Sequence, residues 1–100
     1  MATAKDAVTV APHIYKVVLE NDRVRALDAR GKPGDKAEMH SHPASVVIAI
    51  TDGKYRSTSP DGQTTEAEMK AGQAMYFDAG EVAIEFTGTG EARVVLVELK

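Results

Sequence analysis

The sequence predicts an all-β domain, a small sandwich or closed barrel of about eight or nine short strands with no significant helix. Three observations support this fold class. The β-rich runs are short, turn signals of glycine, proline, asparagine and aspartate recur every eight to twelve residues, and no segment keeps a 3.6-residue apolar period over three turns. One hundred residues suffice for one modest core. We therefore expect a single domain over 1–100, with the barrel core at about 13–99 and an N-terminal arm at 1–12.

The first half of the chain contains four of the expected strands. The runs 13–20 and 24–30 are separated by a turn at Asn21-Asp22. The loop 31–35 follows, in which Pro33 fixes φ and Gly34 permits a left-handed or tight conformation. The segment KAEMHSH then leads into the apolar run 44–51, which Asp52-Gly53 ends.

The second half continues the same pattern to the end of the chain. The runs 54–59 and 64–69 flank the segment 60–63, whose sequence PDGQ indicates a hairpin turn. A further turn at 70–73 precedes the short run 74–77, and the chain breaks again at 78–80. The last two expected strands, 82–86 and 92–99, are divided by glycines at 88 and 90.

Composition excludes several classes of function. The formal charge is -3 and no long run of one sign occurs, so nucleic acid and anionic membranes are not expected as partners. The chain has no cysteine, which rules out disulfides and thiolate chemistry. The N-terminus has no apolar signal region, and no apolar stretch approaches the roughly 18 residues of a membrane span. We therefore expect a cytoplasmic protein.

The apolar run 44–51 is apolar on both faces. Val46, Ile48 and Ile50 lie on one side of the expected strand, and Val47 and Ala49 lie on the other. Only one face of a strand can line the interior of a small barrel. Because the other face must meet a second sheet or a second subunit, we expect a homodimer.

Two spaced motifs resemble those of the cupin superfamily. The first contains Gly34, then five residues, then His40-x-His42, with Gly53 further on. The second contains Gly72, then five residues, then a stretch with Gly80 that has Asp78 where the family usually has proline. The likeness covers roughly residues 15–99 and is closest to the very small single-domain bacterial cupins. It implies a cupin-type double-stranded β-helix, that is, a jelly-roll barrel.

The resemblance also implies a metal site, but this chain departs from the family pattern there. Cupins typically hold a metal with two histidines and a glutamate of the first motif and a histidine of the second. His40 and His42 match the pair. The remaining family positions hold other residues, whether the shorter or the longer motif spacing applies. The glutamate position is occupied by Val46 or Val47, and the second-motif histidine position by Val82 or Ala83. The asparagine that usually follows this histidine is replaced by Phe86 or Thr87. The motif is thus degenerate, and we expect one divalent transition-metal ion (Zn, Ni, Mn or Fe) to bind weakly or not at all.

Strand alternation assigns the remaining candidate residues. Glu38 is the candidate third ligand, because positions 38, 40 and 42 share a face if that strand is regular. In the run 81–86 the apolar side chains alternate with glutamates and should face inward. We expect an apolar interior lined by Val46, Ile48, Val82, Ile84 and Phe86.

Three functions are compatible with this pattern. The first is a small-molecule-binding or non-enzymatic module whose interior accepts a small apolar molecule. The second is a metal-dependent cupin enzyme, of the oxygenase, isomerase or lyase kind, that uses His40 and His42. The third is an engineered cupin scaffold from which the native metal site has been removed. The sequence identifies no catalytic residue that would decide among them.

Overall fold

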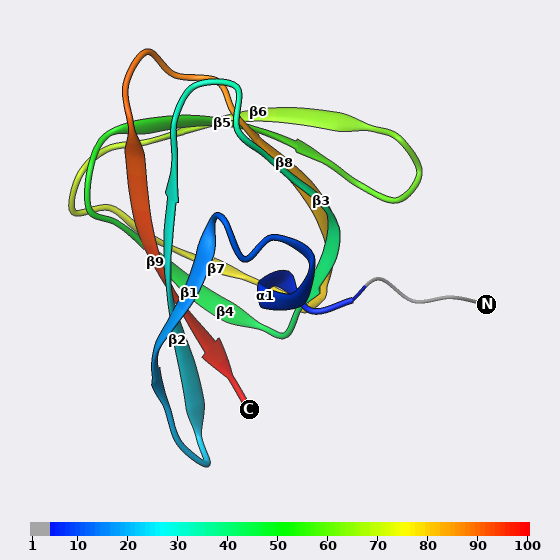
Figure 1. Cartoon of the computed structure of the whole chain (residues 1–100), viewed down its shortest axis with the longest axis vertical. Coiled ribbons are helices and arrows are strands. Elements are labelled where there is room, and N and C mark those ends of the chain that lie inside the picture. The colour runs from blue at the N-terminus through cyan, green and yellow to red at the C-terminus, as the bar shows by residue number, and fades with distance from the viewer. Residues whose placement is uncertain (1–4) are drawn as a thin grey trace.

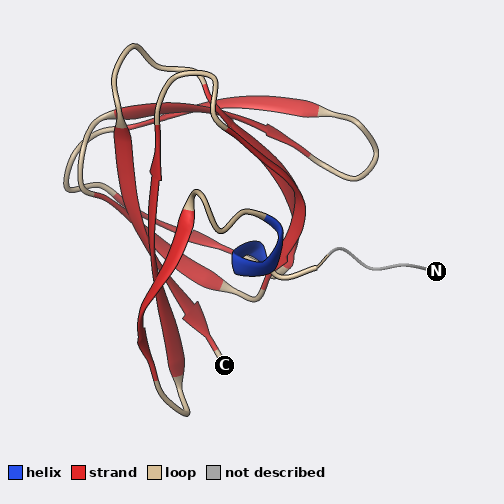
Figure 2. Cartoon of the chain, in the orientation of Figure 1, coloured by secondary structure: helices blue, strands red, loops and turns tan. Residues whose placement is uncertain are grey.

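A computed structural model describes residues 5–100, and these residues form nine strands and one turn of helix (Figures 1 and 2). The strands are β1 (Tyr15–Glu20), β2 (Val24–Gly31), β3 (Lys36–His42), β4 (Ser45–Ala49), β5 (Gly53–Thr58), β6 (Thr64–Met69), β7 (Ala74–Phe77), β8 (Gly80–Phe86) and β9 (Ala92–Leu99). The predicted all-β fold is confirmed. Each strand lies close to a run that the sequence pattern indicates.

The strands form two antiparallel sheets that face each other. One sheet has the order β1-β2-β9-β4-β7 and the other has the order β3-β8-β5-β6. Figure 1 shows the β1–β2 hairpin projecting away from the four-stranded sheet. In the central strand β9, Val94, Leu96 and Glu98 are buried between the sheets. The core therefore lies on the inner face of each sheet, as expected for a sandwich or barrel.

The N-terminal segment packs against the barrel. Asp6 caps the short helix α1 (Ala7–Val10), because its carboxylate accepts a hydrogen bond from the Val8 backbone N–H at 3.2 Å. Ala7 and Ala11 are fully buried, and the backbone N–H of Ser41 donates to the carbonyl of Lys5 at 2.8 Å. The segment thus covers one end of the barrel beside β3. Within residues 5–100 no helix is long and apolar enough to cross a membrane.

Strand β3 is irregular next to the histidine pair. Its pairing with β8 shifts in register between Ala37 and His40. A bulge of this kind interrupts the strict alternation of side chains along a strand. After the bulge, His40 lies opposite Val82 and His42 lies opposite Gly80. The loop before β3 behaves as predicted, since Gly34 has a φ of 92°.

Candidate functional site

A cavity of about 300 Å³ lies between the two sheets. Most of its wall is apolar and comes from both sheets, including Val47, Met69, Val82, Ile84, Phe86 and Leu96. His42, Ser45, Ser57, Asp78 and Glu81 supply polar groups to the lining. This volume is at the lower end of the range for small-molecule sites, and a mainly apolar wall with a few polar groups is typical of them.

Of the residues predicted to line the interior, those on one strand do so and those on the other do not. Val82, Ile84 and Phe86 on β8 line the cavity, whereas Val46 and Ile48 on β4 do not. The cavity is lined instead by Val47, which alternates with them. The expectation for Val46 and Ile48 is therefore corrected. Both faces of β4 are apolar, so hydrophobicity alone could not show which face the barrel would bury.

His40 is fully buried, and both of its ring nitrogens are hydrogen-bonded. The side chain has no exposed surface. Its Nδ1–H donates to the carbonyl of Glu38 at 2.6 Å, and its Nε2 accepts from the hydroxyl of Tyr15 at 3.2 Å. We assign these roles because a backbone carbonyl can only accept a hydrogen bond. Burial lowers the pKa of His40 and raises the pKa of Tyr15, which favours the neutral form of both groups.

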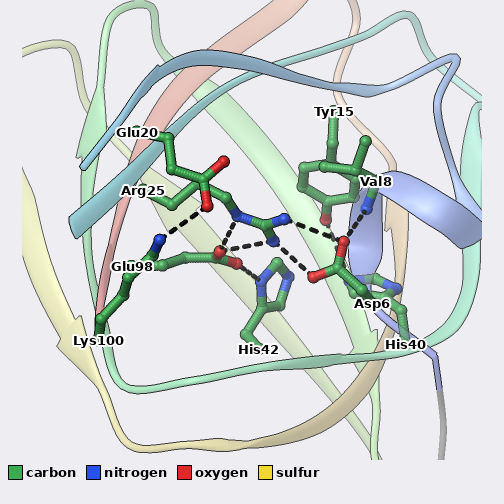
Figure 3. Close-up of polar contacts among 9 residues, drawn as sticks. All are labelled: Asp6, Val8, Tyr15, Glu20, Arg25, His40, His42, Glu98 and Lys100. Atoms are coloured by element: carbon green, nitrogen blue, oxygen red, sulfur yellow. Dashed lines mark hydrogen bonds and ion pairs between the residues drawn. The ribbon is translucent and has the colours of Figure 1, made fainter. Parts of the chain in front are cut away.

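His42 lies at the end of a chain of charged groups (Figure 3). Its Nδ1–H donates to Oε2 of Glu98 at 2.7 Å, and the Nε–H of Arg25 donates to Oε1 of the same carboxylate at 2.7 Å. The other end of the Arg25 guanidinium bonds to Asp6, with one contact at 3.2 Å. The Glu98 side chain is only 2% exposed. The buried carboxylate therefore has a charged or hydrogen-bonded partner on each oxygen, as a buried charge requires.

The Arg25 guanidinium also sets the ionisation of Asp6. Partial burial acts to raise the pKa of Asp6, but the hydrogen bond and the positive charge of Arg25 outweigh it and the pKa is lowered. Asp6 at the start of α1 is therefore held as an anion beside Arg25. This contact ties the N-terminal segment to β2, and through Glu98 to β9 and β3.

Three rings pack together beside this chain of charges. Tyr15, His40 and His42 form edge-to-face pairs, with ring centroids separated by 4.7 to 5.5 Å. Tyr15 and His42 line the cavity, while His40 lies behind them. Of the histidine pair, only His42 faces the space in which a ligand would sit.

The residues present do not fit a metal centre of the family type. Such a centre needs at least three protein ligands, and residues 5–100 contain no group of three or more His, Cys, Asp or Glu side chains that could hold a metal ion. The side chain of Glu38, the candidate third ligand, is exposed and lines a separate surface depression with Lys36 and Arg56. The bulge in β3 explains this placement, because the regular alternation that would bring Glu38 to the histidine face does not hold.

The sequence pattern does not identify the partners of the two histidines. Tyr15, Arg25 and Asp6 lie far from His40 and His42 along the chain, and no local motif marks them. The burial of Glu98, by contrast, could have been predicted from the sequence. This residue follows Val94 and Leu96 at the same two-residue spacing within the run ARVVLVEL, so alternation places a carboxylate on the buried face.

Comparison with known proteins identifies the family. A family model described as the cupin domain matches residues 29–98. The chain belongs to the cupin family. Curated proteins gave no match to the sequence.

Several solved structures share the fold of this cupin. It resembles a cupin domain from Bordetella pertussis with a TM-score of 0.80 and 24% identity, covering 100% of this chain and 99% of that one. An uncharacterised double-stranded β-helix protein from Klebsiella pneumoniae has a TM-score of 0.68 and 25% identity, with coverage of 86% and 75%. A variant of oxalate decarboxylase from Bacillus subtilis has a TM-score of 0.64 and 21% identity, with coverage of 86% and 24%. The predicted jelly-roll fold is confirmed.

Proposed function

We propose that this cupin binds a small, largely apolar molecule in the cavity between its sheets, without a metal ion. The observation that carries the proposal is the combination of a cavity of about 300 Å³ with a mainly apolar wall and a single histidine, His42, held in place at its edge. The second histidine of the pair is buried and both of its ring nitrogens are hydrogen-bonded. In this proposal His40 contributes to packing, and His42 contacts the ligand.

The polar groups of the cavity indicate what kind of molecule it accepts. Because Nδ1 of His42 donates to Glu98, Nε2 of the neutral ring is a hydrogen-bond acceptor that a ligand can use. Asp78 places a carboxylate in the same lining, and among residues 5–100 no lysine or arginine contributes to this lining. A ligand with an apolar body and one hydrogen-bond donor, such as a hydroxyl, matches these groups. A carboxylate ligand would face like charge and no cation.

Fluorescence titration with 1-naphthol tests this proposal. The molecule has an apolar body and one hydroxyl, and the protein contains no tryptophan that would interfere with its signal. With a chelator in all buffers, we expect saturable binding of one molecule per chain. At roughly 0.5 kcal/mol per heavy atom, the dissociation constant is on the order of 0.1–1 mM. The methyl ether, 1-methoxynaphthalene, should bind several-fold more weakly, because it cannot donate to His42.

Two substitutions on the same strand provide a matched control. Val82→Phe places a larger side chain in the cavity and should abolish binding, whereas Ala83→Phe changes the opposite face of β8 and should leave binding intact. Binding of 1-naphthol that is unaffected by Val82→Phe would place the ligand elsewhere and contradict the proposal. So would binding that occurs only in buffers that contain no chelator.

A further inference from the structure

The polar groups of the cavity lining gather at one end of the barrel. His42 at the end of β3 lies opposite Gly80 at the start of β8. Ser45 at the start of β4 lies opposite Phe77 at the end of β7. The short link from β7 to β8 therefore crosses from one sheet to the other beside His42, and Asp78 belongs to this link. We call this end of the cavity the polar end, and its lining residues are His42, Ser45, Phe77, Asp78, Gly80 and Glu81.

The opposite end of the cavity is apolar. Along β8 the lining side chains that follow the polar end are Val82, Ile84 and Phe86. Phe86 lies opposite Tyr55 on β5, and their rings pack edge to face with centroids 5.3 Å apart. Gly80 and Phe86 are the two ends of β8, so about 20 Å of extended strand separates them. A ligand in the cavity thus meets polar groups at one end and apolar side chains along its body.

The polar end is also the end that opens to solvent. Phe77 lines the cavity and yet is 46% exposed, and Asp78 and Gly80 are exposed as well. At the other end, Met69 and Phe86 are both buried. A ligand can therefore enter with its apolar body first and keep its polar group at the opening.

The charges around the polar end are mainly negative. Asp78 and Glu81 belong to the lining, and among residues 5–100 no lysine or arginine contributes to it. The network behind the histidine contains two carboxylates, of Glu98 and Asp6, and one guanidinium, of Arg25 (Figure 3). Two carboxylates against one guanidinium leave this network negative as well. The field at the opening therefore favours a cation and opposes an anion.

Three groups at the polar end suit an ammonium group. Asp78 supplies a carboxylate, and Nε2 of His42 accepts a hydrogen bond. The exposed ring of Phe77 supplies an aromatic face, which attracts cations. We propose that the ligand of this cavity is an amine with an apolar body, whose ammonium group lies at the polar end beside Asp78 and His42. This inference rests on the proposed function and adds the charge of the ligand to it.

Fluorescence titration with three naphthalene derivatives tests the proposal. At neutral pH 1-(aminomethyl)naphthalene is a cation, 1-naphthalenemethanol is neutral and 1-naphthoic acid is an anion, and each carries a one-carbon substituent on the same body. With a chelator in all buffers, we expect the amine to bind on the order of tenfold more tightly than the alcohol, because the carboxylate and the aromatic face each contribute a few-fold. The acid should bind more weakly than the alcohol. Added salt should weaken binding of the amine but not of the alcohol.

Two substitutions that each remove one negative charge provide a matched comparison. Asp78→Asn changes an exposed residue in the link between two strands, where misfolding is a small risk. It should reduce the affinity for the amine to nearly that for the alcohol, and leave the affinity for the alcohol unchanged. Glu91→Gln is the control, because Glu91 is exposed and precedes β9 at the apolar end, where Ala92 pairs with Gly31 next to Phe86. This variant should keep the preference for the amine.

The possible failures separate this proposal from the proposed function. Equal affinities of the wild-type protein for the amine and the alcohol would overturn the proposal and leave the ligand-binding function intact. A preference for the amine that persists in Asp78→Asn would overturn it too, and so would amine binding that Val82→Phe does not reduce. If none of the three compounds showed saturable binding, both the proposal and the proposed function would be wrong.

Discussion

Glu98 is the residue that connects the most distant parts of this molecule. Its carboxylate on β9 accepts hydrogen bonds from Arg25 on β2 and from His42 on β3, and Arg25 bonds to Asp6 before α1. The carboxylate is almost completely buried. Removing one member of a buried charge pair leaves the other without compensation, which commonly costs about 3–5 kcal/mol.

Replacing Glu98 should therefore destabilise the fold strongly, and a second substitution should restore part of the loss. We expect Glu98→Leu to lower the free energy of unfolding by about 3 kcal/mol, because Arg25 keeps only Asp6 as its partner. The double variant Glu98→Leu with Arg25→Met should be more stable than Glu98→Leu alone. Urea unfolding of the single and double variants gives the coupling energy. Additive effects of the two substitutions would show that the pair is not coupled.

His40 predicts a pH dependence of stability. Burial lowers its pKa in the folded protein below the ordinary value of about 6.5, which the unfolded chain retains. As the pH falls below about 6.5, the unfolded chain takes up a proton that the folded protein does not. The free energy of unfolding should therefore decrease until the lowered pKa of the folded state is reached.

The His40→Asn variant separates this effect from the titration of other groups. It lacks the ring that titrates, so its stability should change less between pH 7.5 and 5.5 than that of the wild-type protein. Urea midpoints across this range measure the difference. Parallel curves for the two proteins would mean that protonation of His40 is not the cause.

At the scale of the strands, β4 shows why face assignment is difficult. Its inner residues Ser45, Val47 and Ala49 are buried, and its outer residues Val46 and Ile48 are half-buried on the other face. Both sets are largely apolar, so either face could have been chosen. In β8, by contrast, the glutamates at 81 and 85 alternate with apolar residues, and Val82, Ile84 and Phe86 line the cavity as predicted. The sequence of a strand indicates which face is buried only when its two faces differ in polarity.

The face of β4 can be tested by adding metal ligands. Val47 and Val82 both line the cavity beside His42, and Val82 lies opposite His40. The double variant Val47→Glu with Val82→His should bind a divalent metal ion such as Ni²⁺, because it adds a carboxylate and an imidazole on the histidine side. The matched variant Val46→Glu with Val82→His has the same composition, but its carboxylate points outward. Isothermal titration should show tighter binding for the first variant, and equal affinities would contradict the assignment.

For the whole molecule, the turn-forming residues predicted where the strands end, but the sequence did not predict which distant side chains contact one another. Glycine, proline, asparagine and aspartate mark the ends of nearly every strand, which is why the strand count followed from the sequence. The cupin fold was indicated instead by the resemblance of the two spaced glycine and histidine motifs to those of the family. The bulge in β3 has no comparable signal, and it removes Glu38 from the histidine face. The contact between His40 and Tyr15 joins residues 25 positions apart and depends on how β1 lies against β3. Such contacts exist only once both sheets have formed.

We propose that hydrogen bonds to Tyr15 and Glu98 hold the two histidines in position without a metal ion. Metal analysis of tag-free protein by plasma mass spectrometry, before and after dialysis against a chelator, tests it most directly. We predict that only traces of zinc, nickel, manganese and iron remain after dialysis, with no change in the melting temperature. One equivalent of any of these metals that survives dialysis would contradict this proposal.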